Sequence, residues 1–234
     1  FTSNFYFWHS GQQYGAESSL FKPFLHTWSL SIEEQYYIIF PIILLIVFNY
    51  FRKYLLSILI IAFVLSLGIA DWGSKHYPSF NFYVLPTRAW ELLAGSMLAY
   101  FEITRGKRSS YRILNLILPS IGLILIAYSL LFFNDEMFHP SISTLTPIFG
   151  VCLIIWFTDK NEFITKILSS KLFVGIGLIS YSLYLWHFPI FAFARINDYM
   201  HGSLIYQFCI AAIILATSIL SYYFVEIPCR NNQN

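Results

Sequence analysis

Seven apolar segments, separated by short polar stretches, run through almost the whole chain. A helix of about 20 apolar residues crosses the hydrocarbon core of a bilayer, and most of the segments approach that length. The sequence therefore predicts an all-α fold, a polytopic transmembrane helical bundle with about seven spans. The fifth segment is short and contains Pro147 and Gly150, which predicts a tilted or broken helix. The predicted spans are residues 35–50, 54–70, 83–101, 112–133, 144–158, 173–194 and 203–225.

Composition excludes two other classes of protein. Only 11% of the residues are charged, 57% are hydrophobic, and the mean hydropathy is +0.62. Soluble domains carry about 25% charged residues, so a water-soluble fold is excluded. The net charge of +2, with no basic run among aromatic residues, argues against a nucleic-acid partner. The cysteines (Cys152, Cys209 and Cys229) are scattered, so neither a bound metal nor a disulfide framework is expected.

Basic residues in the loops predict how the bundle is oriented. Ten Lys and Arg residues follow the odd-numbered spans, the last span included, whereas three lie in the opposite loops. The positive-inside rule places the richer side in the cytoplasm. Residues 1–34 are then extracytoplasmic, residues 35–225 form the bundle, and residues 226–234 form a cytoplasmic tail.

A first polar cluster lies directly before the first span. Ser31 and Glu34 have the spacing of a capping box, which predicts a helix start at this point. His26 and Glu33 are left without a structural explanation, and they could form an acid/base pair or hold a polar substrate. Trp28 fits the same substrate role, or simply an interfacial aromatic belt.

A second cluster lies within the predicted third span. Arg88 and Glu91 are three residues apart and share a helix face, so they can form an ion pair. A structural pair that fixes helix packing is one interpretation, with Gly95 on the same face permitting close approach. The other is a cation that faces a polar cavity and holds an anionic or ester group. We favour the functional interpretation, because a buried ion pair contributes little to stability.

A third cluster lies on the predicted sixth span. Ser180, Tyr184 and His187 are spaced to line one helix face, and the histidine can serve as a general base or remain a neutral, hydrogen-bonded side chain.

The end of the last span has a simpler interpretation. Arg230 is expected to reach the interface while Pro228 stops the helix.

These motifs together resemble the acyltransferase-3 family of integral-membrane O-acyltransferases. The motifs are Lys22-Pro23 followed by residues 26–37 (HTWSLSIEEQYY), residues 87–95 (TRAWELLAG), 179–189 (ISYSLYLWHFP) and 226–230 (EIPCR). Residues 3–8 (SNFYFW) are similar to the bacterial branch that modifies envelope polysaccharides. The motifs follow the family's order and cover nearly the whole chain.

The resemblance implies that residues 1–234 form one membrane acyltransferase domain in the bacterial inner membrane. It implies transfer of an acetyl group from acetyl-CoA, a substrate and not a bound cofactor, to a hydroxyl of an extracytoplasmic glycan. Lipopolysaccharide, peptidoglycan and exopolysaccharide all fit, and membrane lipid is a further partner. The expected catalytic residues are Arg88, Glu91 and His187, and the expected substrate-binding residues are His26, Trp28, Glu33, Ser180 and Tyr184.

One departure from the family pattern affects this expectation. The family has about ten helices and begins with an arginine-and-histidine motif that this sequence lacks. We therefore expect a chain truncated at its N-terminus, without the family's principal histidine and inactive alone. A transporter or flippase that uses the same polar residues as a pathway is the alternative, as is a non-catalytic scaffold for glycan assembly. No inverted repeat of the kind common in transporters is present.

Overall fold

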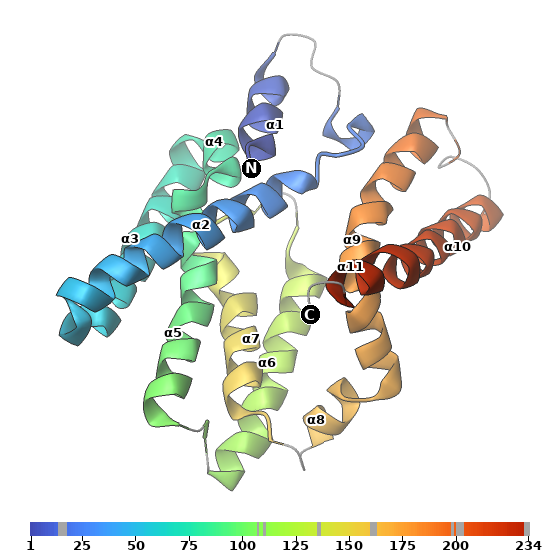
Figure 1. Cartoon of the computed structure of the whole chain (residues 1–234). Coiled ribbons are helices and arrows are strands. Elements are labelled where there is room, and N and C mark those ends of the chain that lie inside the picture. Colours follow the sequence, from blue (N-terminus) through green and yellow to red (C-terminus); the bar gives the residue numbers. More distant parts are fainter. Residues whose placement is uncertain are drawn as a thin grey trace.

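A computed structural model of the chain describes residues 1–13, 18–106, 108–109, 111–134, 137–159, 163–197, 199 and 204–231. These residues form helices joined by short turns, and they contain no strand (Figure 1). The predicted all-α class is therefore confirmed. The helices are α1 (Ser3–Gln12), α2 (Thr27–Tyr50), α3 (Leu55–His76), α4 (Pro78–Tyr83), α5 (Ala89–Arg105), α6 (Arg112–Phe132), α7 (Leu145–Phe157), α8 (Phe163–Leu168), α9 (Lys171–Ile196), α10 (Leu204–Ser221) and α11 (Ile227–Asn231).

Five helices are long and apolar enough to cross a membrane. They cover Thr27–Tyr50, Arg52–His76, Ile113–Phe132, Lys171–Ile196 and Leu204–Arg230. Helix α5, with 17 residues, and the shorter α7 account for the other two predicted spans without reaching that length. Large apolar side chains are exposed along these helices, as expected where lipid is the solvent. The structure thus supports a polytopic helical protein and does not establish a count of seven spans.

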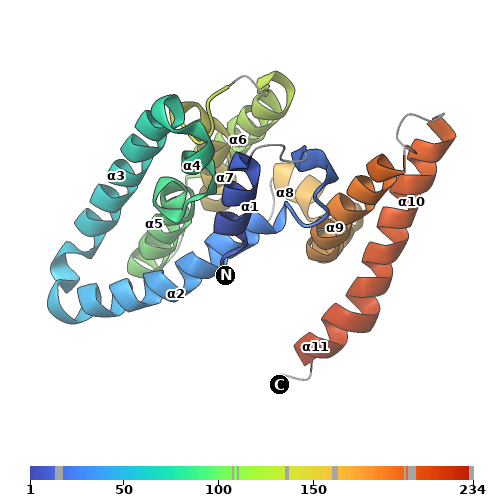
Figure 2. The same cartoon turned by 90° about the horizontal axis from the view of Figure 1, so that it is seen from above.

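The helices form two groups, each with its own apolar contacts (Figure 2). In the first group, Tyr36, Leu59 and Leu93 bring α2, α3 and α5 together. In the second, Ala194 packs against Ile210 where α9 meets α10. The N-terminal end of α2 and the segment before it lie beside α9, so the first polar cluster is at the junction of the two groups (Figures 1 and 2).

Helices α6 and α7 cross at a pair of glycines. A Cβ atom added to Gly122 would lie 2.5 Å from the carbonyl oxygen of Gly150, and one added to Gly150 would lie 2.7 Å from that of Gly122. Small residues of this kind let helix backbones approach closely in a membrane. The prediction that Gly95 serves this purpose is wrong, since nothing lies within 4 Å of its Cβ position. The expected break in the fifth span is also absent, because Pro147 lies in the first turn of α7, where proline is tolerated.

The start of α5 differs from the predicted third span. Residues Leu85–Thr87 form a 3₁₀ turn that contains Pro86, and α5 begins only at Ala89. Arg88 is therefore the N-cap residue of α5 and does not lie in the middle of a span. The Ser66 hydroxyl on α3 donates to the Pro86 carbonyl (2.6 Å) and accepts from the Trp90 amide (3.0 Å), which fixes this helix start.

The last helix continues further than the sequence predicted. A π-helical turn (Tyr222–Glu226) follows α10 and leads directly into α11, so Pro228 does not stop the helix. The physical reason is that Pro228 is the second residue of α11, and the wider turn before it already changes the hydrogen-bonding pattern. Residues 232–234 of the predicted tail lie outside the described residues.

Candidate functional site

His26 is the central side chain of the junction between the two helix groups. Its ring lies 5.3 Å from the Phe188 ring in a stacked arrangement, and it meets the rings of Tyr184 (4.9 Å) and His187 (5.4 Å) edge-on. Only 8% of the residue is exposed. Neither ring nitrogen has a hydrogen-bond partner among the described residues. A buried polar group without a partner is rare, so His26 is the strongest indication of a ligand at this position.

The electrostatic state of His26 follows from its surroundings. Burial and, to a smaller extent, the electrostatic influence of His187 lower the pKa of His26 from 6.5 to about 4. Its imidazole is therefore neutral at physiological pH, with one nitrogen able to donate and the other able to accept. Such a ring can bind a hydroxyl group through both of its functions.

Tyr184 connects α9 to the beginning of α2. Its hydroxyl donates to the carbonyl oxygen of His26 and lies 2.8 Å from the Ser29 hydroxyl. Since the tyrosine proton is used on the carbonyl, the serine hydroxyl is the donor of the second bond. These contacts bring the first and third polar clusters together, and Ser29, which has no role in the sequence analysis, takes part in them.

His187 is held in one tautomer by its own helix. Its Nδ1 lies 2.7 Å from the carbonyl oxygen of Tyr184 and 3.1 Å from that of Leu183. A carbonyl oxygen only accepts, so we assign the proton of the neutral ring to Nδ1. The lone pair is then on Nε2, which is the arrangement that a general base requires.

A cavity of about 260 Å³ adjoins these residues. It is lined by Glu33, Ser180 and Tyr184, three of the predicted substrate-binding residues, together with Leu30 and Tyr181. The Glu33 carboxylate makes no hydrogen bond or ion pair with any residue that the structure describes, whereas the Ser180 hydroxyl donates to the Gly177 carbonyl (2.7 Å). The cavity therefore offers a polar substrate the Glu33 carboxylate, since the Ser180 and Tyr184 hydroxyls already donate to backbone carbonyl oxygens.

Arg88, Glu91 and Trp28 form a second polar group between α2 and the start of α5. The guanidinium of Arg88 is 3.1 Å from the Glu91 carboxylate and lies over the rings of Trp28 (5.1 Å) and Phe82 (4.8 Å). Its Nε is buried without a partner among the described residues. Glu91 occupies the first turn of α5, where the helix dipole favours a negative charge. The predicted ion pair is present. Trp28 contacts the Arg88 guanidinium, which an interfacial aromatic belt alone would not explain.

The two polar groups are not in direct contact. Across the described residues, no hydrogen bond, ion pair or ring contact joins the group of Arg88, Glu91 and Trp28 to that of His26, Glu33, Ser180, Tyr184 and His187. Trp28 and His26 are two residues apart in the chain, but Trp28 contacts Arg88 whereas His26 contacts α9. Helix α2 therefore separates the predicted catalytic arginine from the predicted catalytic histidine.

The predicted capping box at the start of α2 is wrong. The helix begins at Thr27, one turn earlier, and no side chain caps it. Ser31 is buried inside the helix, where its hydroxyl lies 2.6 Å from that of Ser3 on α1. Tertiary contact with α1 thus accounts for Ser31, which the local motif could not reveal.

A further acidic residue was given no chemical role by the sequence. Glu226, in the π-helical turn, accepts a hydrogen bond from the Ser182 hydroxyl on α9 (3.2 Å). Both residues line a cavity of about 340 Å³ on another side of α9. The signal that could have indicated Glu226 is an acidic side chain close to an apolar span.

Comparison with known proteins adds information that geometry cannot. A family model described as an acyltransferase domain matches residues 1–223. Peptidoglycan O-acetyltransferase OatA of Listeria monocytogenes is 31% identical, with 99% of this chain and 39% of that protein aligned. O-acetyltransferase OatA of Staphylococcus aureus is 29% identical, with 89% of this chain and 36% of that protein aligned. A proposed O-acetyltransferase of Staphylococcus aureus strain COL is 33% identical over 92% of this chain and 37% of its own length. No solved structure matches the chain.

Proposed function

The chain belongs to the acyltransferase domain family, and from this premise we propose that the protein transfers acetyl groups to hydroxyls of a cell-envelope glycan. The chain spans about two-fifths of the length of the curated relatives that it matches, so the activity is proposed for the whole protein. Two of those relatives carry the name O-acetyltransferase OatA, and peptidoglycan is the glycan in one of the names. Peptidoglycan is therefore the acceptor that we test first.

The observation that carries the proposal is the buried His26 without hydrogen-bond partners, next to His187. An acyl transfer to an alcohol needs a base near the nucleophile and a group that orients it. Neutral His26 can hold the acceptor hydroxyl, while His187 has the lone pair of Nε2 to remove its proton. Glu33, Ser180 and Tyr184 then line the space for the rest of the sugar.

The proposed reaction proceeds as a single acyl transfer. The acceptor hydroxyl loses its proton to His187 Nε2 as its oxygen forms a bond to the carbonyl carbon of the acetyl group. The bond between that carbon and the donor breaks, and the protonated histidine returns the proton to the leaving group. We propose acetyl-CoA as the donor, in which case the thioester C–S bond is the one that breaks.

Arg88 is proposed to stabilise negative charge on the acetyl carbonyl oxygen. Its Nε–H has no acceptor among the described residues, and Glu91 and Trp28 hold the guanidinium in place. Donors of this kind contribute about 10²–10³ in rate to related reactions. Because α2 separates Arg88 from His187, this role requires that the carbonyl group reach past the beginning of α2.

We propose that the protein is located in the bacterial inner membrane. The basic loops favour an orientation in which residues 1–34 are outside and the C-terminal end is in the cytoplasm. His26 then lies at the outer end of α2, where a glycan acceptor can reach it from the cell envelope. Membrane lipid, the glycan acceptor and the acyl-CoA donor are the partners implied by this arrangement.

The test uses membranes that carry the protein as the cell expresses it, supplied with acetyl-CoA labelled in the acetyl group. Base-labile label on peptidoglycan is measured for the wild type, for His187→Gln and for His76→Gln. His76 is a matched control because its Nδ1 also contacts a carbonyl of its own helix, that of Trp72 (2.8 Å), away from the site. We expect label with the wild type and His76→Gln, and a loss of at least about 100-fold with His187→Gln.

The contrary results are distinct. Label that is unchanged in His187→Gln would refute the role of this histidine and leave acetyl transfer intact. The absence of label on any glycan with the wild type would refute acetyl transfer itself. Glycan that crosses the membrane without covalent change would instead support a transporter.

A further inference from the structure

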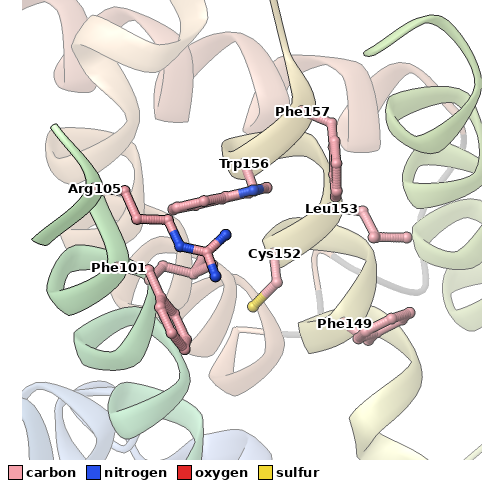
Figure 3. Close-up of a pocket in the computed structure, with 8 residues that line it drawn as sticks. Phe101, Arg105, Phe149, Cys152, Leu153, Trp156 and Phe157 are labelled. Carbon is pink, nitrogen blue, oxygen red and sulfur yellow. The ribbon is translucent and has the colours of Figure 1, made fainter. Parts of the chain in front are cut away.

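A groove between α5 and α7 lies at the end of the bundle where both helices finish (Figure 3). Its cavity of about 290 Å³ is formed mainly by Phe101, Phe149, Leu153 and Trp156. The guanidinium of Arg105 extends from α5 between Phe101 and Trp156 (Figure 3). The groove thus combines a long apolar surface with one cation at its end, and neither the family nor the proposed reaction accounts for it.

A second cavity, of about 370 Å³, adjoins the groove. It shares Arg105, Trp156 and Phe157 with the first cavity. It adds Arg108 and Ser109 from the loop after α5, together with Tyr111 and Leu114. The groove therefore continues from an apolar part between the helices into a basic part at their ends. An apolar part followed by a basic part fits an amphiphile whose apolar chain lies along the helices and whose anionic group lies at the membrane surface.

The two arginines differ in how they are neutralised. Arg108 is bound to the Glu102 carboxylate (3.0 and 3.2 Å) and donates to the Ile155 carbonyl oxygen on α7 (3.0 Å). Arg105 lies over the Phe101 ring (5.5 Å) and has no ion pair or hydrogen bond with a described residue. Its fork of N–H donors is therefore available to an anion, beside a fixed second cation.

We propose that this groove binds an anionic phospholipid, with one acyl chain against Phe101, Phe149 and Trp156 and the phosphate on Arg105. Arginine binds phosphate oxygens in a bidentate manner, and basic pockets between membrane helices bind anionic headgroups. In the sequence, Lys107 and Arg112 are also basic, which gives four basic residues between positions 105 and 112. The positive-inside rule places this loop in the cytoplasm, where the anionic lipids of a membrane attract basic segments.

A lipid fits the groove better than a nucleotide-linked donor does. The pantetheine arm of acyl-CoA carries two amide groups. Burying an amide without a hydrogen-bond partner is unfavourable in free energy. The apolar part of the groove presents aromatic and aliphatic side chains and the thiol of Cys152. An acyl chain needs no hydrogen bonds there. The inference is independent of the proposed acetyl transfer, because it concerns only lipid binding.

The experiment measures quenching of tryptophan fluorescence by brominated lipids in phosphatidylcholine nanodiscs. Brominated phosphatidylglycerol and brominated phosphatidylcholine are compared at equal mole fractions for the wild type, Arg105→Gln and Arg52→Gln. Arg52 is a matched control because its guanidinium also lies over a phenylalanine ring, that of Phe48 (4.5 Å), outside the groove. Trp156→Phe identifies the tryptophan that reports on the site.

We expect phosphatidylglycerol to be preferred by the wild type and by Arg52→Gln. Arg105→Gln should weaken that preference about fivefold, as expected for one basic residue at an anionic surface, while quenching by phosphatidylcholine, which reports an intact fold, stays the same. In Trp156→Phe, tryptophan fluorescence should no longer be quenched more by brominated phosphatidylglycerol than by brominated phosphatidylcholine. A preference unchanged in Arg105→Gln, equally reduced in Arg52→Gln, or retained in Trp156→Phe would overturn the proposal. Displacement of the brominated lipid by millimolar acetyl-CoA would also overturn it and assign the groove to the donor.

Discussion

Replacing Tyr184 by Phe tests whether the contact between α9 and α2 builds the candidate site. The substitution keeps the aromatic ring beside His26 and removes the hydroxyl alone. Two hydrogen bonds are lost, one to the His26 carbonyl and one from the Ser29 hydroxyl. The perturbation is therefore confined to the link between the two helix groups.

The size of the effect follows from what the former partners can still do. A hydrogen bond contributes about 1 kcal/mol net, so losing two costs about 2 kcal/mol. The Ser29 hydroxyl lies 3.3 Å from the His26 carbonyl and can donate to it when the tyrosine hydroxyl is absent. Both groups thus keep a partner, and we expect a net loss of about 1–2 kcal/mol.

Unfolding of the purified protein in detergent by heat or denaturant measures this loss, with Tyr181→Phe as the control. Tyr181 lines the same cavity from the same helix, and its hydroxyl has no hydrogen bond to a described residue. We expect Tyr181→Phe to change stability by less than about 0.5 kcal/mol. Acetyl transfer should fall in Tyr184→Phe and stay near the wild-type rate in Tyr181→Phe.

Equal stability of the two tyrosine variants would refute the reasoning. It would mean that the contact between α9 and α2 does not hold the helix groups together. A stable Tyr184→Phe protein with full acetyl transfer would further show that His26 and His187 are positioned by other contacts.

Three further predictions test other parts of the structure. Gly150→Ala should destabilise the protein by about 1–3 kcal/mol in thermal unfolding, because its Cβ would meet backbone on α6, whereas Gly95→Ala should stabilise it by about 0.5–1 kcal/mol. Stability should fall as the pH drops from 6.5 towards 4, because the unfolded state binds a proton at His26 that the folded state, with a pKa of about 4, does not; thermal unfolding of His26→Gln should lack this part of the acid loss. Arg88→Lys should keep the charge beside Glu91 and a folded protein, yet lose about 10²-fold in acetyl transfer.

Each of these predictions has a contrary result. Equal thermal shifts in both glycine variants would contradict the close crossing of α6 and α7. An acid sensitivity that is the same in His26→Gln and the wild type would mean that His26 does not titrate as its buried position implies. Full acetyl transfer by Arg88→Lys would show that the arginine acts only as a structural cation.

Helical spacing in the sequence predicted which polar residues share a helix, but it could not predict which residues of different helices meet. Three residues of the third cluster, Ser180, Tyr184 and His187, were correctly placed on one helix, because helical spacing is a local property. The capping box at Ser31 failed since a distant hydroxyl on α1 binds that side chain. Arg88 was expected inside a span, and the 3₁₀ turn that ends the preceding segment moved it to a helix start.

By itself the sequence determined that this protein is helical and membrane-embedded. That result needs only the apolar character of successive residues, because in lipid each helix satisfies its own backbone hydrogen bonds. Only the tertiary structure decided that His26 faces His187 and Tyr184, and that Arg88 lies on the other side of α2. Such pairings depend on how each helix is rotated and where helices cross. Side chains more than 150 residues apart in the chain, such as Ser29 and Tyr184, set that geometry together.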